Sequence, residues 1–371
     1  MRLAVYNVEN LFNRAKVMNR QDWGIGRQIL AQFAELNSLL GEANYTANRK
    51  RRMVRLLTAL GLGRSDRGPA VILRRNRGGL VKRPRNADPE IIADGRADWV
   101  GSLELVEAPI DHESMLMTAR VIRDVDADIL AMVEAESRPA LQMFNQEIVT
   151  AVGGREYECV MLIDGNDSRG IDVGIAVKDP CSIGLMRSHV HDMPSRGEPP
   201  IFSRDCPEYF VSTDSGVDIL VMINHFKSKG YGTQAANNAR RKSQAERVRE
   251  IYRERMREGF EYIAIVGDFN DTPDSSPLRP LHYRFSAKDV FEHPDFDDGG
   301  YPGTYGSCRA TNKIDYLLLS PRLYAAVRRG GVWRKGMWAG VRPVRWDTYE
   351  ELNREVHAGS DHACLWVDLE L

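Results

Sequence analysis

Apolar residues recur along the chain in runs of strand length. The segments 219–224 (ILVMIN) and 262–267 (YIAIVG) are apolar at nearly every position, a pattern typical of strands that are covered on both faces. We therefore expect buried β-sheets. The predicted strands span residues 2–8, 128–134, 157–163, 173–177, 209–213, 217–224, 261–266, 314–319 and 363–369.

Segments with helical periodicity lie between these strands, at residues 26–40, 47–60, 115–125, 137–152 and 235–258. Strands and helices alternate irregularly, and no GxxxxGK(S/T) or GxGxxG stretch opens a helix after a strand, which disfavours nucleotide-cradling folds. The pattern favours a mixed α/β sandwich. We expect one domain over residues 1–371 that carries a helical and basic insertion at about 14–112.

The composition is that of an ordinary globular protein, with 43% hydrophobic and 28% charged residues. No apolar run approaches the roughly 18 residues that a membrane span needs, and residues 2–7 resemble a strand more than a signal peptide. The five cysteines lie far apart and form no CxxC pair, so we expect reduced, structural thiols and neither disulfides nor zinc. A cytoplasmic location is the expectation.

Positive charge is concentrated in one stretch of the chain. Residues 49–85 contain thirteen Lys or Arg against Asp66 alone, although the net charge of the whole chain is −1. A basic arm that gathers a polyanion near the active site is one interpretation. A solvated or partly disordered insertion is the other.

The cluster GDFND follows the predicted strand 261–266. Asp268 and Asn270 are two positions apart, so we expect them on one face of an extended strand end. Attack of water on a phosphodiester needs a carboxylate that accepts or orients the proton, and a neutral amide can fix water or a phosphate oxygen. Taken alone, these residue types are equally typical of a turn.

Two histidines stand beside other strands. In the SDH cluster, Asp361 could reach a metal while His362 stabilises charge or transfers a proton. His225 ends the run ILVMIN and is soon followed by Lys227 and Lys229, a cationic group suited to an anionic substrate. A polar strand end without function is the alternative for His225.

Asn7 and Glu134 each end a predicted strand. One carboxylate, one amide and water form a ligand set that Mg²⁺ prefers, whereas zinc favours more His or Cys. We favour Glu134 over Glu136, which lies in the first turn of the next predicted helix. Asp315 opens another strand, where its carboxylate could orient the His362 ring.

Six motifs occur in order between residues 6 and 362: YNVENLF, VEAES, NHFKSK, GDFNDTP, KIDYLLLSP and SDH. Together they resemble the endonuclease/exonuclease/phosphatase superfamily, the metal-dependent hydrolases that include pancreatic deoxyribonuclease and inositol-phosphate phosphatases. The resemblance implies a deoxyribonuclease-I-like, four-layered α/β sandwich. In that fold, two packed mixed β-sheets are flanked by helices, and the active site lies at one end of the sheets.

The resemblance also implies a role for each residue of the site. The metal ligands would be Asn7, Glu134 and Asp361, with Mg²⁺ as the cofactor and Mn²⁺ as an alternative. The catalytic residues would be His225 with Asp172 as its acidic partner, Asp268 and Asn270 at the nucleophilic water and phosphate, and His362 paired with Asp315. Phosphate contacts are expected from Arg204 in FSRD, from Arg169 in DSRGID and from Lys227.

One departure from the family concerns spacing, because Glu134 lies 127 positions after Asn7, much further than in compact members. The expected function is Mg²⁺-dependent phosphodiester hydrolysis, most consistent with a nuclease acting on DNA or RNA because the basic stretch favours a polymer. Two alternatives stay open: a phosphatase, phospholipid or small-molecule phosphodiesterase of the same superfamily, and an inactive phosphate-binding module. Nothing in the sequence predicts protein partners.

Overall fold

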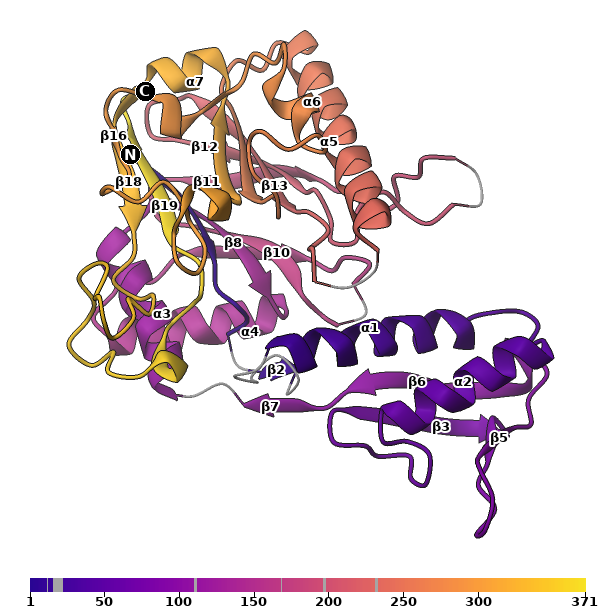
Figure 1. Ribbon diagram of the computed structural model, residues 1–371. Helices are drawn as coiled ribbons and strands as arrows, with labels where there is room; N and C mark the ends of the chain where they lie inside the picture. The colour runs from indigo at the N-terminus through magenta and orange to yellow at the C-terminus, as the bar shows by residue number, and fades with distance from the viewer. Residues whose placement is uncertain (12, 16–22, 110–111, 168, 196–197, 231–232) are drawn as a thin grey trace. The chain divides into compact units, whose positions relative to one another are not determined.

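The structure is a computed structural model that describes residues 1–11, 13–15, 23–109, 112–167, 169–195, 198–230 and 233–371. The chain forms two compact units (Figure 1). The first unit contains residues 1–12, 110–228 and 234–371, and the second contains 13–109 and 229–233. The second unit covers nearly the same residues as the predicted insertion.

The first unit is built on two β-sheets. The seven-stranded sheet has the order β16-β18-β19-β1-β8-β10-β9. Its strands are β1 (Arg2–Asn7), β8 (Ile129–Ala135), β9 (Cys159–Ile163), β10 (Asp172–Val177), β16 (Phe296–Asp297), β18 (Val327–Trp333) and β19 (Cys364–Leu369). Because β1 runs parallel to β8, the carboxyl ends of both strands, with Asn7 and Glu134, meet at one edge of the sheet.

The six-stranded sheet has the order β11-β12-β13-β14-β17-β15. Its strands are β11 (Ser182–Arg187), β12 (Glu208–Ser212), β13 (Asp218–His225), β14 (Ile263–Asp268), β15 (Lys288–Asp289) and β17 (Asp315–Leu319). The strand β14 pairs in parallel with β13 and antiparallel with β17. In this register His225 lies opposite Asp268, and Asp268 lies opposite Asp315.

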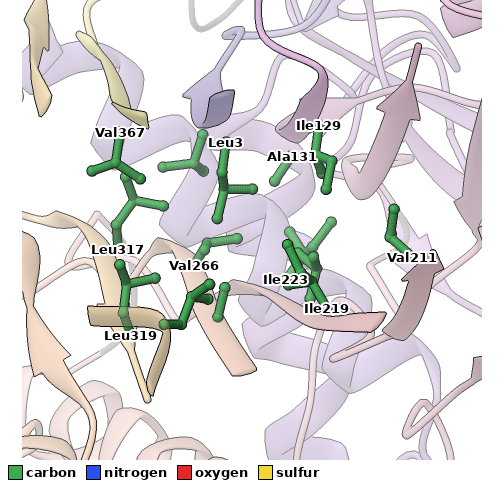
Figure 2. Close-up of a cluster of buried hydrophobic side chains, with 14 of the residues drawn as sticks. Leu3, Ile129, Ala131, Val211, Ile219, Ile223, Val266, Leu317, Leu319 and Val367 are labelled. Atoms are coloured by element: carbon green, nitrogen blue, oxygen red, sulfur yellow. The ribbon is translucent and has the colours of Figure 1, made fainter. Parts of the chain in front are cut away.

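The two sheets pack face to face through aliphatic side chains (Figure 2). Leu3, Ile129 and Val367 come from the seven-stranded sheet, and Ile223 and Leu317 come from the six-stranded sheet. Branched side chains on every second position of a strand fill the space between two sheets well. This core fixes the two strand ends that carry most of the predicted site.

Helices cover the outer faces of both sheets. The helices α3 (His112–Val125) and α4 (Arg138–Met143), with the π-helical segment η2 (Phe144–Val149), share a buried cluster with β1, β8 and β9. The helices α5 (Gln234–Arg257) and α6 (Arg279–His282) share another cluster with β12, β13, β14 and β17. The remaining short elements are α7 (Pro321–Ala325), η3 (Val290–Glu292), η4 (Ala310–Asn312) and η5 (Glu355–His357). The predicted four-layered α/β sandwich is therefore confirmed.

The second unit has its own hydrophobic core. Its elements are β2 (Asn13–Ala15), α1 (Trp23–Leu40), α2 (Ala47–Ala59), β3 (Val71–Gly78), β4 (Val81–Lys82), β5 (Glu90–Ile91), η1 (Arg96–Asp98), β6 (Trp99–Leu105) and β7 (Glu107–Pro109). Leu36, Leu57, Val71 and Trp99 are buried together in this core. The basic stretch 49–85 is thus folded, and the alternative of a partly disordered stretch is wrong.

The strand β3 escaped prediction because its sequence, VILRRNRG, buries side chains only at its amino end. The rest of the strand is exposed and rich in arginine, which hides the alternation that marks a strand. Among the helices that the structure describes, none is long and apolar enough to cross a membrane.

Candidate active site

Three predicted catalytic residues form a row across the six-stranded sheet. His225 ends β13, Asp268 ends β14 and Asp315 begins β17, so the backbone pairing alone makes them neighbours. The His225 Nε2 atom lies 3.7 Å from Asp268 Oδ2 and 3.5 Å from Glu134 Oε1. The row therefore meets the carboxyl end of β8, which belongs to the other sheet.

His362 pairs with Asp315 as predicted from the sequence. The Asp315 Oδ2 atom lies 2.8 Å from His362 Nδ1 and accepts a hydrogen bond from Thr304 Oγ1 at 2.6 Å. Burial by itself lowers the pKa of His362, but the Asp315 carboxylate outweighs burial and raises that pKa well above its ordinary value. The His362 Nε2 atom lies 3.4 Å from Asn7 Nδ2.

The serine of the SDH motif joins two strands of the seven-stranded sheet. Ser360 Oγ donates to the Asn7 carbonyl at 2.7 Å and accepts from the His362 backbone N–H at 3.0 Å. The ends of β1 and β19 are thereby held in fixed relation, which positions Asn7 beside His362. Neither Ser360 nor Thr304 was predicted as a site residue, although Ser360 stands inside a quoted motif.

Asp268 and Asn270 come together by a route that differs from the predicted one. The strand β14 ends at Asp268, and Asn270 lies beyond it with a φ of 54°, so the two residues do not share an extended strand face. The chain turns back, and Asn270 donates to both carboxylate oxygens of Asp268, from its backbone N at 2.8 Å and from Nδ2 at 3.0 Å. The two residues lie together, but a left-handed turn and not a shared strand face produces this arrangement.

The glycine of GDFN is required by a close approach of two strands. Gly267 has a φ of 135°, and a Cβ at this position would lie 1.9 Å from the Asn224 carbonyl oxygen. Only glycine fits there. The motif thus allows β13 and β14 to approach closely, directly before His225 and Asp268.

Glu134 occupies a β-bulge. Across from β8, Val173 pairs with Val133 and Asp172 pairs with Ala135, so Glu134 is the extra residue between them. Its φ is 66°, a conformation that non-glycine residues adopt rarely. A bulge re-aims a side chain that would otherwise follow the strand alternation, and here it brings the carboxylate to His225.

Strained backbone is concentrated around this site. Among the described residues, seven non-glycine residues have positive φ values. Glu9, Asn10, Glu134 and Asn270 stand in the loops or the bulge beside Asn7 and Asp268, and the other three are Asp126, Arg284 and Cys308. Such conformations persist where the surrounding structure holds them, and they gather at functional sites.

Acidic side chains gather closely enough to hold a cation. The ligand atoms of Glu134, His225 and Asp268 lie within 4.8 Å of one another, as do those of Asp268, Asp315 and His362. Burial and the Asp315 carboxylate raise the pKa of Asp268 to about 8. Neighbouring buried carboxylates repel one another unless a cation compensates their charge. The oxygen donors of Asp268, Glu134 and Asn7 suit a hard divalent ion. The residues therefore fit a divalent metal ion.

Asp361 lies at the rim of this arrangement. Its side chain is 43% exposed, and its Oδ1 atom lies 3.7 Å from His362 Nε2. The Asp361 backbone N donates to Glu9 Oε2 at 3.2 Å. Among the described residues, Asp361 belongs to neither group of closely spaced ligand atoms.

The predicted pairing of Asp172 with His225 is not formed in the structure. Asp172 Oδ1 accepts from the Gly165 backbone N at 2.8 Å, and burial raises the pKa of Asp172 to about 6. His225 Nδ1 is buried, with no hydrogen-bond partner among the described residues. Burial, followed by the charge of Arg204, lowers the pKa of His225 well below its ordinary value.

The three predicted phosphate ligands gather next to His225. The Asp167 carboxylate holds two of them: Arg169 Nη2 donates to Asp167 Oδ2 at 2.6 Å, and Arg204 Nε lies 3.1 Å from the same oxygen. Burial, followed by the charges of Arg204 and Arg169, lowers the pKa of Lys227 to about 7. Asp167 was not predicted, although DSRGID begins at this residue.

A buried arginine of α5 fixes the two loops that follow β13 and β14. Arg241 is fully buried. It donates from Nη1 to the Lys227 carbonyl at 2.9 Å and from Nε to Asp271 Oδ2 at 3.1 Å. The sequence does not identify Arg241 as the residue that joins these loops, because it stands in a helix with many similar charges.

Comparison with known proteins places this chain in a family. The sequence profile of the endonuclease/exonuclease/phosphatase family matches residues 110–362, whereas none of the curated proteins matches significantly. A mannosyl-6-phosphatase structure from Bacteroides thetaiotaomicron is 19% identical with a TM-score of 0.50, and the likeness covers 69% of this chain and 90% of that chain. An endonuclease/exonuclease/phosphatase family protein from the same organism gives 19% identity and a TM-score of 0.50, with 68% and 84% covered.

Truncated TDP2 from Caenorhabditis elegans is 15% identical, with a TM-score of 0.46 over 68% of this chain and 89% of that chain. The likeness to the two Bacteroides structures shows a shared fold, whereas the profile match, which spans more than half of the chain, shows shared ancestry. Most of the second unit, residues 13–109, lies outside the matched region. The chain belongs to the endonuclease/exonuclease/phosphatase family of phosphoesterases.

Proposed function

We propose that this protein is a Mg²⁺-dependent phosphodiesterase that hydrolyses DNA or RNA by attack of water on phosphorus. The observation that carries the proposal is the arrangement around Asp268. This carboxylate is hydrogen-bonded by Asn270 on one side, and the His362 Nε2 atom lies 4.0 Å from Asp268 Oδ2 on the other. The Asp268 carboxyl group, whose pKa is raised, thus lies beside an imidazole that is oriented by its own carboxylate, Asp315.

In the proposed reaction, Asp268 accepts or orients the proton of the attacking water. The Asn270 hydrogen bonds fix the carboxylate, so its position changes little during the reaction. His362 stabilises the charge that develops on the phosphate oxygens, and Asp315 keeps the imidazole cationic and oriented. His225, whose lowered pKa favours the neutral ring, offers a hydrogen bond without adding charge.

Asn7 and Glu134 would hold the Mg²⁺ ion, with Asp361 as the third predicted ligand and Mn²⁺ as an alternative metal. When bound, the metal supplies Lewis-acid stabilisation of phosphate charge. On the substrate side, Arg204, Arg169 and Lys227 would bind phosphate oxygens. Burial, followed by repulsion from Arg204 and Arg169, lowers the pKa of Lys227, and an anion between the three groups would relieve that repulsion.

The distribution of charge favours a polymeric substrate. Residues 13–109, outside the matched family region, contain eighteen Lys and Arg against ten Asp and Glu. A small phosphomonoester or a lipid head group needs no such surplus, whereas a nucleic acid is attracted by it over many phosphates. We retain a cytoplasmic location as part of the proposal, since all five cysteines are free thiols.

The experiment compares the hydrolysis of four substrates side by side. Plasmid DNA, RNA, p-nitrophenyl phosphate and phospholipid are incubated with the full chain in Mg²⁺ or Mn²⁺. We expect hydrolysis of nucleic acid, and a loss of at least about 1,000-fold in kcat for Asp268→Asn and for His362→Asn.

Asp274→Asn is the matched control, because Asp274 is exposed and lies in the same loop as Asp268. It should keep wild-type activity. Full activity of Asp268→Asn would refute the catalytic assignment. A clear preference for the phosphomonoester or the phospholipid would favour the corresponding alternative, and no hydrolysis of any substrate would favour an inactive phosphate-binding module.

A further inference from the structure

The second unit contains a group of arginines on neighbouring segments, two of which contact a single carboxylate. We name the group, Arg64, Arg67, Arg75, Arg83 and Arg85 together with Asp66, the Asp66 cluster. The Asp66 Oδ2 atom accepts a hydrogen bond from Arg75 Nη2 at 2.6 Å, and Asp66 Oδ1 lies 2.8 Å from Arg83 Nη1. The cluster holds five guanidinium groups and one carboxylate, and so has an excess of four positive charges.

The fold of the second unit holds this cluster together. Arg64 Nη1 donates to the Pro84 carbonyl at 2.9 Å, and Arg83 Nη2 donates to the Leu62 carbonyl at 3.0 Å. The Leu73 backbone N donates to the Asp66 carbonyl at 2.7 Å. The loop 62–68, the start of β3 and the segment 82–87 are therefore joined to one another, over a core that includes Leu62 and Leu73.

Several basic residues elsewhere in this unit have carboxylate partners. Their ion pairs are Arg49 with Glu42, Lys50 with Asp94, Arg52 with Glu35 and Arg74 with Glu104. Within the described part of the chain, by contrast, the exposed side chains of Arg67 and Arg85 make no ion pair. The exposed Arg51, Arg55, Arg77 and Lys82 likewise make no ion pair within the described part of the chain. The Asp66 cluster is distinguished from them by the hydrogen bonds that join its segments.

We propose that the Asp66 cluster binds the phosphodiester backbone of a nucleic acid. The proposal rests on the proposed function. It adds residues that bind the polymer and that are not among the catalytic groups. Guanidinium groups match phosphate oxygens in charge and in planar donor geometry. Basic surfaces that bind membranes also present apolar anchors. The exposed large hydrophobic residues described in this unit, Ile92 and Val100, lie outside the loop 62–68 and the segment 82–87. The cluster therefore favours a nucleic acid over a membrane.

The test measures binding separately from catalysis. Fluorescence anisotropy of a labelled duplex oligonucleotide, titrated with the full chain in EDTA at several salt concentrations, gives the affinity and its salt dependence. We expect Arg67→Gln/Arg85→Gln to weaken binding about 10-fold at low salt and to reduce the slope of log K against log salt by about 1 to 2. The variant should hydrolyse bis(p-nitrophenyl) phosphate at the wild-type rate.

The matched control is Arg52→Gln/Arg74→Gln, which removes the same net charge from the same unit but from arginines that already have carboxylate partners. It should change the affinity and the salt slope far less. An equal loss in both double variants, or no loss in either, would overturn the proposal. So would binding to phosphatidylserine vesicles that only Arg67→Gln/Arg85→Gln loses, with oligonucleotide affinity unchanged.

The two proposals fail in different ways. If the chain binds the oligonucleotide through the Asp66 cluster but hydrolyses no phosphoester in Mg²⁺, the proposed function is wrong and the binding surface stands. If hydrolysis is found but Arg67 and Arg85 do not affect binding, only the binding surface is wrong.

Discussion

At the scale of single residues, the site depends on side chains that orient other side chains through hydrogen bonds. Thr304 is fully buried. Its hydroxyl donates to Asp315 Oδ2 and accepts from the Asp315 backbone N at 3.1 Å, so it fixes both ends of the residue that orients His362. Residues of this kind contact no substrate. They decide whether the groups that do so are correctly placed.

Replacing this hydroxyl should slow catalysis without preventing folding. We expect Thr304→Val to lower kcat roughly 10-fold to 100-fold with little change in KM, because the size of the side chain is kept while Asp315 loses a hydrogen bond. Thr304→Ser should restore most of the activity. Steady-state kinetics on bis(p-nitrophenyl) phosphate measure both.

Thr311→Val provides the control, because Thr311 is exposed and its hydroxyl contacts only Asn312 among the contacts described for it. Wild-type kcat in Thr304→Val would show that Asp315 needs no such support. A rise in KM with unchanged kcat would assign Thr304 to substrate binding instead.

At the scale of elements, strand ends and the helix packed behind them decide the geometry. The bulge at Glu134 and the left-handed turn at Asn270 bring two side chains into the site that regular strands would place elsewhere.

Away from the catalytic groups, the buried His189 joins the surroundings of two strands, β11 and β12, to the helix α5. Its ring nitrogens lie 2.9 Å from Asp192 Oδ2 and 2.9 Å from Glu208 Oε1, and Glu208 also binds Arg255 of α5.

This buried histidine should make the stability of the fold depend on pH. Burial lowers the pKa of His189, but the hydrogen bond to Glu208 and the Asp192 carboxylate outweigh burial, and the net effect raises the pKa. A raised pKa in the folded state stabilises the fold fully below the unfolded value of about 6.5, and the stabilisation is lost as pH rises through the folded pKa. The free energy of unfolding should therefore fall over that alkaline range.

Urea denaturation at several pH values above about 6 checks this dependence. In His189→Gln the decline should be weaker, by about 1.4 kcal/mol for each unit by which folding raises the pKa. His191→Gln, which changes an exposed histidine two positions away, should behave as the wild type. Identical pH profiles in the wild type and His189→Gln would contradict the assignment.

At the scale of the whole molecule, an independent unit is inserted into the family fold. The second unit has a separate core, and β2 pairs with β7 so that Asn13 lies opposite Pro109. The two ends of the insertion therefore meet. Insertions with adjacent ends disturb the host fold little, since they leave its chain path unchanged.

Removing the insertion should leave an active first unit. We expect a chain in which a short Gly-Ser linker replaces residues 13–109 to unfold cooperatively and to hydrolyse bis(p-nitrophenyl) phosphate at a rate within about 3-fold of the full chain, because the catalytic side chains and their core lie outside the deletion. Oligonucleotide affinity should fall. Thermal unfolding followed by circular dichroism and the hydrolysis assay measure the first two outcomes. A soluble, folded variant without activity would show that the second unit completes the catalytic site.

The sequence by itself determined nine strands of the two main sheets, the longer helices and the family motifs, because apolar runs and polar strand ends are local patterns. It did not predict β11, β15, β16 and β18, which belong to the same sheets. It also predicted the pairing of His362 with Asp315, which the structure contains. It did not predict the fold of residues 61–100, because β3 presents arginines where a strand pattern would show alternation.

Only the tertiary structure decided how the side chains meet. It separated Asp172 from His225, joined Asp268 to Asn270 through a left-handed turn and brought Thr304 to Asp315. These contacts depend on strand register, a bulge and positive φ values, which arise from packing between segments far apart in the chain. A local pattern identifies the reactive groups, whereas their distances are set by the sheets that hold them.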